Sequence, residues 1–388
     1  MKLLARCIRG IEWLLAAEVR GLGAEVVSIG HRALEFSLGA QPSESQLRLG
    51  CADDVFLVVG ELRGIDHRRA SLSVLGAAAA RLPVEATLAT LRSLRGAPLG
   101  GMFTVVASFL GSRNYNRYAV EDAVAQGIAR ATGLVYESSR DGSPERPVLV
   151  FRVHLLDDSA SFSLRVFQEP LHRRGYKQRS YPGTLHPPLA RAMAMLAGLA
   201  PQASVLDPFC GVGTALIEAA LLERSARYCG VDIDTERVSA TRENAGLAGV
   251  RVEVAQGDAA SLPFEAATFT RVVTNLPWGL AVEPEGRLRD GPAELLWAEL
   301  ARVLRPDGRA VILTDKGTAL ATAAKHAELQ LLLRSRVSLF GQHPELWLLG
   351  AAGVAKGTLI EPSAPFGPQL LENLPLAERL PLDFGVAG

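Results

Sequence analysis

Several features that define common classes of protein are missing from this sequence of 388 residues. It has four cysteines, none in a CxxC pair or a Cys/His cluster, so we expect no zinc site and a reducing compartment. No apolar run is long enough to span a bilayer, and Arg6 and Arg9 interrupt the start before a signal peptide develops. We therefore predict a cytoplasmic protein that binds no metal and no membrane.

The sequence also lacks an excess of charge of either sign, because 41 Lys and Arg residues balance 41 Asp and Glu residues. Any surface that binds nucleic acid must therefore be local. The fractions of hydrophobic residues (48%) and charged residues (21%) are typical of a soluble globular protein. The length allows two or three domains, including a complete α/β core.

One stretch, Val205 to Thr214, has the pattern of a nucleotide-binding turn. An apolar strand ends at Asp207, and Gly211 and Gly213 permit a tight turn before helical periodicity resumes. The third glycine of a dinucleotide fingerprint is absent, since Leu216 occupies its place, and no Gly-Lys-Ser/Thr follows. Pyrophosphate binding is thus disfavoured. Asp207 would instead accept hydrogen bonds from an ammonium group.

This stretch, DPFCGVGT, resembles the first motif of Rossmann-like methyltransferases in its DPFCGSGT form, with Val212 in place of the usual serine. The resemblance implies S-adenosylmethionine as the cofactor. The candidate cofactor-binding residues are Asp207, Phe209, Gly211, Gly213, Thr214, Asp232, Asp258 and Ala259. The alternative interpretation is an ordinary tight turn between a strand and a helix.

Two further acidic residues follow predicted strands. Asp232 ends the strand 228–232, where a carboxylate can accept hydrogen bonds from both ribose hydroxyls, whereas Asp234 suits a helix N-cap. Asp258 follows the strand 252–255, and the resemblance implies that it accepts from the adenine amino group while Ala259 supplies a backbone N–H. Since Gly-Asp is also common turn chemistry, a purely structural role for Asp258 stays open.

The chemical centre is predicted at Asn275-Leu276-Pro277-Trp278, at the end of a fourth strand. It resembles the (N/D)-x-P-aromatic motif of enzymes that methylate exocyclic amines, with Trp in place of the common Tyr or Phe. The Asn275 side-chain oxygen and the Leu276 carbonyl can each accept one amine hydrogen, because Pro277 turns the chain there. Trp278 would stack on a flipped-out base. The motif contains no cysteine nucleophile, which argues against methylation at pyrimidine C5.

The whole chain is predicted to be α/β: a Rossmann-like class I methyltransferase domain preceded by an α+β ferredoxin-like/THUMP RNA-binding region. The alternation of strand and helix signals after residue 189 predicts a parallel sheet. The expected segments are 1–52, ferredoxin-like; 53–168, THUMP; 169–188, a basic linker; 189–355, the methyltransferase domain; and 356–388, a Pro-rich tail. Within the catalytic domain we expect a turn over 304–309 and a closing hairpin of strands 337–340 and 346–349.

The order of motifs beginning SFLGSRNYNRY resembles that of a THUMP domain, and this resemblance implies a module that binds the acceptor end of tRNA. Basic side chains interleaved with aromatic side chains suit contact with RNA. The candidate RNA-binding residues are Arg113, Arg117, Arg173, Arg174, Lys177 and Arg179. A solvated loop and a solvated basic linker are the alternatives.

Together the motifs are similar to those of the THUMP-containing tRNA guanine-N2 methyltransferases that modify position 6 of the acceptor stem. The resemblance implies a monomeric enzyme that methylates guanosine N2 in tRNA. A ribosomal RNA guanine-N2 methyltransferase, an adenine-N6 methyltransferase and an inactive RNA-binding protein are the alternatives. The motif at Asn275 does not decide between the two bases, because both amines need the same hydrogen-bond acceptors.

Overall fold

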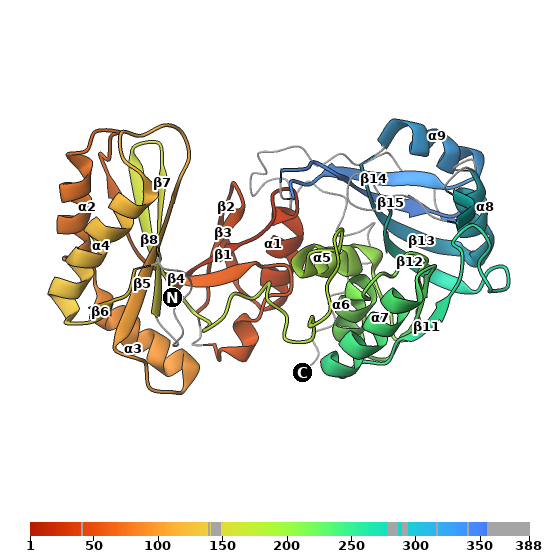
Figure 1. Ribbon diagram of the computed structural model, residues 1–388, viewed down its shortest axis with the longest axis horizontal. Coiled ribbons are helices and arrows are strands. Elements are labelled where there is room, and N and C mark those ends of the chain that lie inside the picture. The colour runs from red at the N-terminus through yellow and green to blue at the C-terminus, as the bar shows by residue number, and fades with distance from the viewer. Residues whose placement is uncertain are drawn as a thin grey trace.

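A computed structural model describes residues 1–39, 42–138, 140, 149–277, 286–288, 294–315, 317–339 and 341–354 of the chain. The molecule is elongated, with an N-terminal region built on one sheet at one end and an α/β domain at the other (Figure 1). Two predictions, the stacking residue Trp278 and the tail 356–388, lie outside the described residues.

The described part of the N-terminal region contains one sheet. Its strands are β1 Lys2–Arg6, β2 Glu25–Gly30, β3 Ala33–Ser37, β4 Asp54–Arg63, β5 Met102–Phe109, β6 Val135–Tyr136, β7 Leu149–Leu156 and β8 Ser159–Arg165. They lie in the order β2-β3-β1-β4-β8-β7-β5-β6. Since β4 pairs with both β1 and β8, the sheet is continuous across the predicted boundary at residue 52. The domain boundaries themselves stay a prediction.

Helices cover one face of this sheet. They are α1 Glu12–Gly21, α2 Ser71–Ala79, α3 Val84–Arg95 and α4 Arg117–Thr132. Alternate strand residues such as Leu3, Val105 and Val153 point into the core shared with these helices. In Figure 1 helices α2 and α4 lie on one side of β5, β7 and β8. The residues between the core positions therefore point to the opposite face, as the two-residue period of a strand requires.

The α/β domain has a second sheet. Its strands are β9 Ser204–Asp207, β10 Arg227–Asp232, β11 Glu253–Gln256, β12 Phe269–Asn275, β13 Leu304–Thr314, β14 Gln330–Arg336 and β15 Glu345–Gly350. They lie in the order β11-β10-β9-β12-β13-β15-β14. The pairings from β11 to β13 are parallel, and β15 is antiparallel to both β13 and β14. The chain runs outward from β9 to β11 and then returns to β12, so a topological switch point lies between β9 and β12.

Both faces of the second sheet are covered. The helices are α5 Pro187–Ala197, α6 Thr214–Leu222, α7 Thr235–Ala248, α8 Glu294–Val303 and α9 Gly317–His326. Alternate residues of β12 and β13 enter two different cores: Val273 and Val311 pack on the side of α5 and α6, while Val272 and Ile312 pack on the side of α8. This pattern is typical of a parallel sheet between helical layers. The predicted Rossmann-like architecture is confirmed.

The two ends of the molecule share a core and a backbone contact. The core of α1 is continuous with that of α5, since both belong to one buried cluster. The backbone N–H of Ser338 donates to the carbonyl of Arg9 at 2.9 Å, and the segment before α1 thus lies along the end of β14. A Cβ on Gly10, whose φ is +102°, would lie 2.3 Å from the Arg336 carbonyl oxygen. Only glycine fits this close approach.

Two predicted boundaries differ in the structure. The segment 304–309 is counted with β13, but its pairing with β12 is interrupted between Leu304 and Arg309, where the register shifts, so an irregularity lies at the predicted turn. The first strand of the closing hairpin is β14, which ends at Arg336, so 337–339 follow that strand, and Phe340 lies outside the described residues. Apolar composition alone did not reveal that Gln330–Arg336 alternates buried and half-buried residues.

Within the same described residues, no single helix has both the length and the apolar composition needed to cross a membrane. Helices α2 and α3 reach that length and composition only as a pair, across a bend of 57°.

Candidate active site

The turn after β9 has the geometry that its glycines predict. Gly211 and Gly213 have φ angles of +54° and +83°, and Gly213 is the N-cap of α6. A Cβ on Gly213 would lie 2.6 Å from the Thr241 Cγ2 atom of α7, so a side chain there meets both strain and a clash. Thr241 also donates its hydroxyl to the carbonyl of Gly211 at 2.7 Å. Helix α7 therefore holds the turn from behind.

A cavity of about 360 Å³ opens at the carboxyl ends of β9, β10 and β12, beside the topological switch point. The predicted site residues that line it are Asp207, Phe209, Gly211, Thr214, Asp232, Asp258, Ala259, Asn275, Leu276 and Pro277. Gly213 does not line the cavity and instead shapes the turn. The structure thus brings the predicted cofactor residues and the described catalytic residues to one place, whereas their individual roles stay predictions.

Asp207 is buried beneath the turn, with 2% of its surface exposed. Its Oδ1 atom accepts hydrogen bonds from the Thr274 hydroxyl at 2.6 Å and from the Phe209 N–H at 3.1 Å. Burial raises the pKa of Asp207 to about 7, the nearby charge of Asp232 adds to this, and the two hydrogen bonds oppose it. A cationic ligand beside Asp207 would favour the ionised carboxylate.

Asp232 ends β10 and accepts the N–H groups of Gly211 at 2.8 Å and Asp234 at 3.1 Å. Burial raises its pKa, and these hydrogen bonds partly counteract the effect. Each carboxylate oxygen has a second lone pair, so both remain able to accept a ribose hydroxyl. Asp234 is the N-cap of α7, where its side chain accepts the Glu236 N–H at 2.8 Å, as predicted.

Asp258 forms the turn that the sequence suggested and also lines the cavity, while its contact with adenine stays a prediction. Its Oδ1 atom accepts the Ala260 N–H at 2.8 Å, which is the local hydrogen bond of an Asx turn. Its Oδ2 atom accepts the N–H of Arg287 at 2.8 Å and therefore ties the segment 286–288 to the cavity rim. Since Asp258 lines the cavity as well, the turn places this carboxylate at the cavity wall.

Asn275 has the clearest unmet hydrogen-bonding capacity in the site. Its Nδ2 atom donates to the carbonyl of Gly183 at 3.4 Å, which fixes the orientation of the amide because a carbonyl only accepts. Its Oδ1 atom is buried and has no partner among the described residues. The Thr214 hydroxyl at the start of α6 is likewise buried without a partner. Buried polar atoms without partners are uncommon in folded proteins, and here both belong to residues that line the cavity.

The sequence analysis missed the residues that form the roof of this cavity. Residues 180–185, which belong to the predicted basic linker, line it together with the turn, and we call them the roof segment. Asn244 of α7, fully buried, bonds to the backbone N–H and carbonyl of Arg179 and to the carbonyl of Val212, and so joins the linker to the cofactor turn. A buried asparagine within a helix is the one signal that would have pointed to this role.

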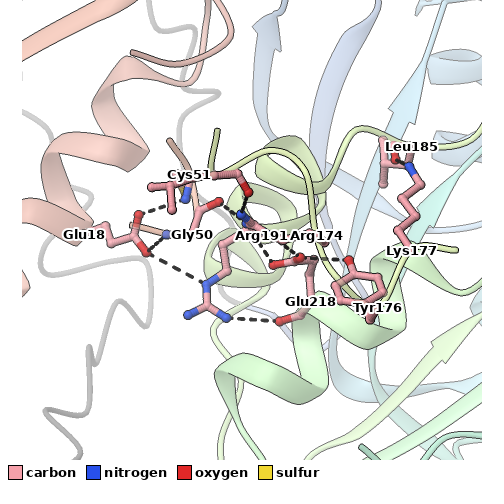
Figure 2. Close-up of polar contacts among 10 residues, drawn as sticks. Glu18, Gly50, Cys51, Arg174, Tyr176, Lys177, Leu185, Arg191 and Glu218 are labelled. Carbon is pink, nitrogen blue, oxygen red and sulfur yellow. Dashed lines mark hydrogen bonds and ion pairs between the residues drawn. The ribbon is translucent and has the colours of Figure 1, made fainter. Parts of the chain in front are cut away.

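Figure 2 shows how the linker is anchored on α6. The buried carboxylate of Glu218 accepts the Arg174 Nε–H at 2.7 Å and the Tyr176 hydroxyl at 2.8 Å. Arg174 also donates to the carbonyl of Gly50 at 2.7 Å, in the N-terminal region. Further along, the Lys177 ammonium donates to the carbonyl of Leu185 at 2.7 Å and closes the roof segment. Burial lowers the pKa of Lys177 to about 8.

A second set of contacts in Figure 2 joins the same helix to α1. The carboxylate of Glu18 accepts the backbone N–H groups of Gly50 at 2.7 Å and Cys51 at 2.9 Å. Arg191 of α5 donates to the Glu218 carbonyl at 3.2 Å, and its Nε atom lies 4.0 Å from Glu18. The N-terminal region is therefore connected through α5 and the linker to the helix that starts at the cofactor turn.

These contacts bear on the predicted RNA-binding residues. The positions of Arg174 and Lys177 do not support contact with RNA, because their donors are used inside the protein. Arg113 likewise donates to the carbonyls of Asp66 and Asp157, at 3.1 and 2.7 Å.

The other three predicted cations are exposed and have only surface partners. Arg117 lies over the Tyr118 ring at 4.6 Å. Arg173 pairs with Glu169 at 3.0 Å, and Arg179 pairs with Glu243 at 3.3 Å. These three keep their predicted role.

The described cysteines are all buried and free, and no group of three or more His, Cys, Asp or Glu side chains in the described ranges is arranged to hold a metal ion. Burial raises the pKa of Cys210 well above its usual value, so this thiol stays protonated beside the cavity.

Comparison with known proteins agrees with this geometry. Residues 174–345 match the family UPF0020, described as an RMKL-like methyltransferase domain. The chain is 32% identical over 229 residues to a tRNA (guanine(6)-N2)-methyltransferase of Thermus thermophilus and 31% identical over 223 residues to a tRNA (guanine(10)-N2)-dimethyltransferase of Methanothermobacter thermautotrophicus. These matches cover 58% and 57% of this chain, and 65% and 62% of the relatives, so less than two thirds of either relative is spanned.

A solved structure extends the similarity along the chain. The crystal structure of TrmN from Thermus thermophilus superimposes with a TM-score of 0.69 at 28% sequence identity, covering 90% of this chain and 99% of that one. The N-terminal region, which the family match does not reach, is therefore shared in fold with that protein.

Proposed function

We propose, from the match of residues 174–345 to the RMKL-like methyltransferase-domain family, that the protein transfers a methyl group from S-adenosylmethionine to the exocyclic N2 amine of a guanosine in tRNA. The observation that carries the proposal is the buried, unpartnered Asn275 Oδ1 atom in the cavity at the switch point. The two curated relatives named above, both guanine-N2 methyltransferases of tRNA, support the choice of base and RNA.

The residues around the cavity fit S-adenosylmethionine. Asp207 suits its ammonium group, and Asp232 suits the ribose hydroxyls. The Thr214 hydroxyl, buried without a partner at the start of α6, has a hydrogen bond to give to an acceptor on the same ligand. The cavity volume of about 360 Å³ lies in the range of small-molecule sites. When bound there, the cofactor supplies an electrophilic methyl group on a sulfonium.

The protein's own contribution is to hold the acceptor amine. The guanine N2 lone pair is delocalised into the ring, so the nitrogen becomes a better nucleophile when its hydrogens are held out of the ring plane. Asn275 Oδ1 accepts one hydrogen, and the carbonyl of Leu276 accepts the other. The Gly183 contact keeps the Asn275 amide in this orientation. An amide is too weak a base to remove a proton, so catalysis rests on alignment, and the proton leaves the nitrogen after the methyl group has been transferred.

The test is methyl transfer from labelled S-adenosylmethionine to unmodified tRNA transcripts, followed by digestion to nucleosides. We expect N2-methylguanosine as the labelled product. Asn275→Ala should lower kcat on the order of a hundredfold or more, as does removal of one preorganised hydrogen-bonding group from other active sites. Its affinity for S-adenosylmethionine should stay close to that of the wild type.

The matched control is Gln126→Ala, which removes an exposed amide from α4 far from the cavity and should leave kcat unchanged. Labelled N6-methyladenosine, or label in ribosomal RNA alone, would replace the proposed substrate. Full activity of Asn275→Ala would refute the proposed role of this residue.

We propose in addition that the acceptor stem at position 6 is the target, that the enzyme acts as a monomer and that it is cytoplasmic. The position is supported by the similarity to the Thermus thermophilus guanine(6) enzyme. Mapping of the labelled nucleotide, sedimentation and cell fractionation test the three proposals separately.

A further inference from the structure

One face of the N-terminal sheet has no helix on it within the described chain, and its centre is rich in cations. The register places Arg6 on β1, Arg165 on β8, and Arg152 and His154 on β7 on this face, because each lies between residues of the helix-covered core. None of the six RNA-binding residues predicted from the sequence belongs to this group. We call Arg6, Arg152 and His154 the sheet-face cluster.

The cluster lacks the anionic partners that such a group needs. Two carboxylates act on Arg6, and both have other partners: Asp53 lies 2.7 Å from His186 and 3.9 Å from Arg32, and Asp54, opposite Arg6 in the register, is bound to Arg165 at 2.6 Å. The Arg6 guanidinium makes no hydrogen bond or ion pair with any described residue. The Nε atom of Arg152 is buried and has no partner in the same part of the chain. The guanidinium groups of Arg6 and Arg152 are therefore half-buried, and neither has an ion-pair partner in the described chain.

Hydrogen bonds to Ser108 tie two members of the cluster together. Arg152 donates an Nη2–H to the Ser108 hydroxyl at 2.8 Å, and that hydroxyl lies 2.8 Å from His154 Nδ1. The Arg6 guanidinium beside them carries only donors and has no hydrogen-bond partner in the described chain, so it matches a ligand that only accepts hydrogen bonds.

The titration behaviour has the same cause. Burial, followed by the charge of Arg6, lowers the pKa of Arg152 to about 9 and that of His154 to about 4. Burial and the charge of Arg32 also lower the pKa of Arg6. The folded protein therefore holds the Arg6 and Arg152 charges against both desolvation and mutual repulsion, and a bound anion would offset these costs by its attraction to both charges.

We propose that the sheet-face cluster is a phosphate-binding site through which this open face docks the backbone of the substrate RNA. The inference rests on the proposed function for the identity of the partner. The RNA is favoured over a small anion because the face extends along strands β1, β8 and β7 and has no covering element in the described chain, so an extended polyanion has access to it.

The experiment compares tRNA binding by Arg152→Gln and Arg6→Gln with that by Arg130→Gln. Arg130 is exposed on α4, which covers the other face of the sheet, so its substitution removes the same charge from the same region. Binding is measured over a series of salt concentrations. Each cluster variant should bind about tenfold more weakly, because a charge-assisted hydrogen bond is lost, and should reduce the salt slope by about one phosphate contact. Arg130→Gln should change neither quantity appreciably.

Thermal unfolding gives a second measurement of anion binding and also shows whether a variant folds. Inorganic phosphate should raise the Tm of the wild type more than chloride at equal ionic strength, and this difference should shrink in Arg152→Gln. Because the substitution removes an unpaired buried cation, its Tm in chloride should not fall. Equal tRNA binding by all three variants would overturn the proposal. A phosphate effect without any change in tRNA binding would also overturn it, since the site would then be one for small anions.

The outcome is separable from that of the methyl-transfer assay. A protein that binds tRNA through the cluster but methylates no RNA would refute the proposed function alone. A protein that methylates tRNA, with cluster variants indistinguishable from Arg130→Gln, would refute the docking site alone.

Discussion

Replacing Glu218 by alanine should destabilise the folded protein far more than the same change at Glu243, although each carboxylate pairs with an arginine of the same linker. Glu218 has 2% of its side chain exposed, and its partner Arg174 has 15%. The Glu243 pair is about half exposed on both sides. The comparison therefore isolates burial as the variable.

The magnitude follows from what each substitution leaves behind. Glu218→Ala leaves the Arg174 guanidinium buried without its carboxylate partner and removes the acceptor of the Tyr176 hydroxyl. Removing one partner of a buried ion pair typically costs about 3–5 kcal/mol. In Glu243→Ala the guanidinium that is left is solvated by water, so no resolvable change is expected.

The assay is urea unfolding followed by circular dichroism for the wild type, both alanine variants and the double variant Arg174→Met/Glu218→Met. The double variant should be more stable than Glu218→Ala, because no unpaired charge remains in the core. A Glu218→Ala variant as stable as Glu243→Ala would refute the reasoning, since it would mean that water reaches Arg174. A double variant less stable than Glu218→Ala would also refute it, because the loss would then lie in the bonds to Gly50 and Leu171.

Three further predictions concern the cofactor turn. Because the pKa of Asp207 is raised to about 7, affinity for S-adenosylmethionine, measured by calorimetry, should fall about tenfold per pH unit below pH 7, and Asp207→Asn should bind weakly with no such slope. The raised pKa of Asp207 also makes the folded state bind more protons than the unfolded state. The contribution of Asp207 to the free energy of unfolding should therefore decrease as the pH rises from about 4 to 7. If the wild type and Asp207→Asn differed in free energy of unfolding by the same amount at every pH, this would be contradicted. Gly213→Ala should lose about 1–3 kcal/mol to backbone strain and bind the cofactor more weakly, whereas wild-type affinity would show that the turn can adjust.

Local patterns in the sequence were sufficient for the cofactor turn. The positive φ at Gly213, the N-cap at Asp234 and the placement of Asp207 and Asn275 at strand ends all follow from residues within a few positions of one another. Since the carboxyl ends of parallel strands meet at one edge of a sheet, their convergence was also predictable.

Long-range pairing was not predictable in the same way. The basic composition of the linker indicated contact with RNA, yet Arg174 lies 44 positions before its partner Glu218 and is neutralised within the protein. The sheet-face cluster depends on the register between β1 and β8 across β4, and a shift of one residue would point Arg6 into the core. The hairpin strand was misplaced because Gln330–Arg336 carries polar residues that mask its buried positions.

Helix α6 gives these separate features a common support. It begins at Gly213, in the cofactor turn, and one turn later Glu218 holds the linker whose roof segment bonds to Asn275 through Gly183. The linker in turn contacts Gly50 of the N-terminal region, where the same sheet carries the cationic face. A short chain of contacts thus connects the proposed RNA-docking face, the cofactor turn and the amine acceptor. Because Glu218 is buried at the centre of this chain and each contact has a defined partner, a ligand at one end meets a site already fixed at the other.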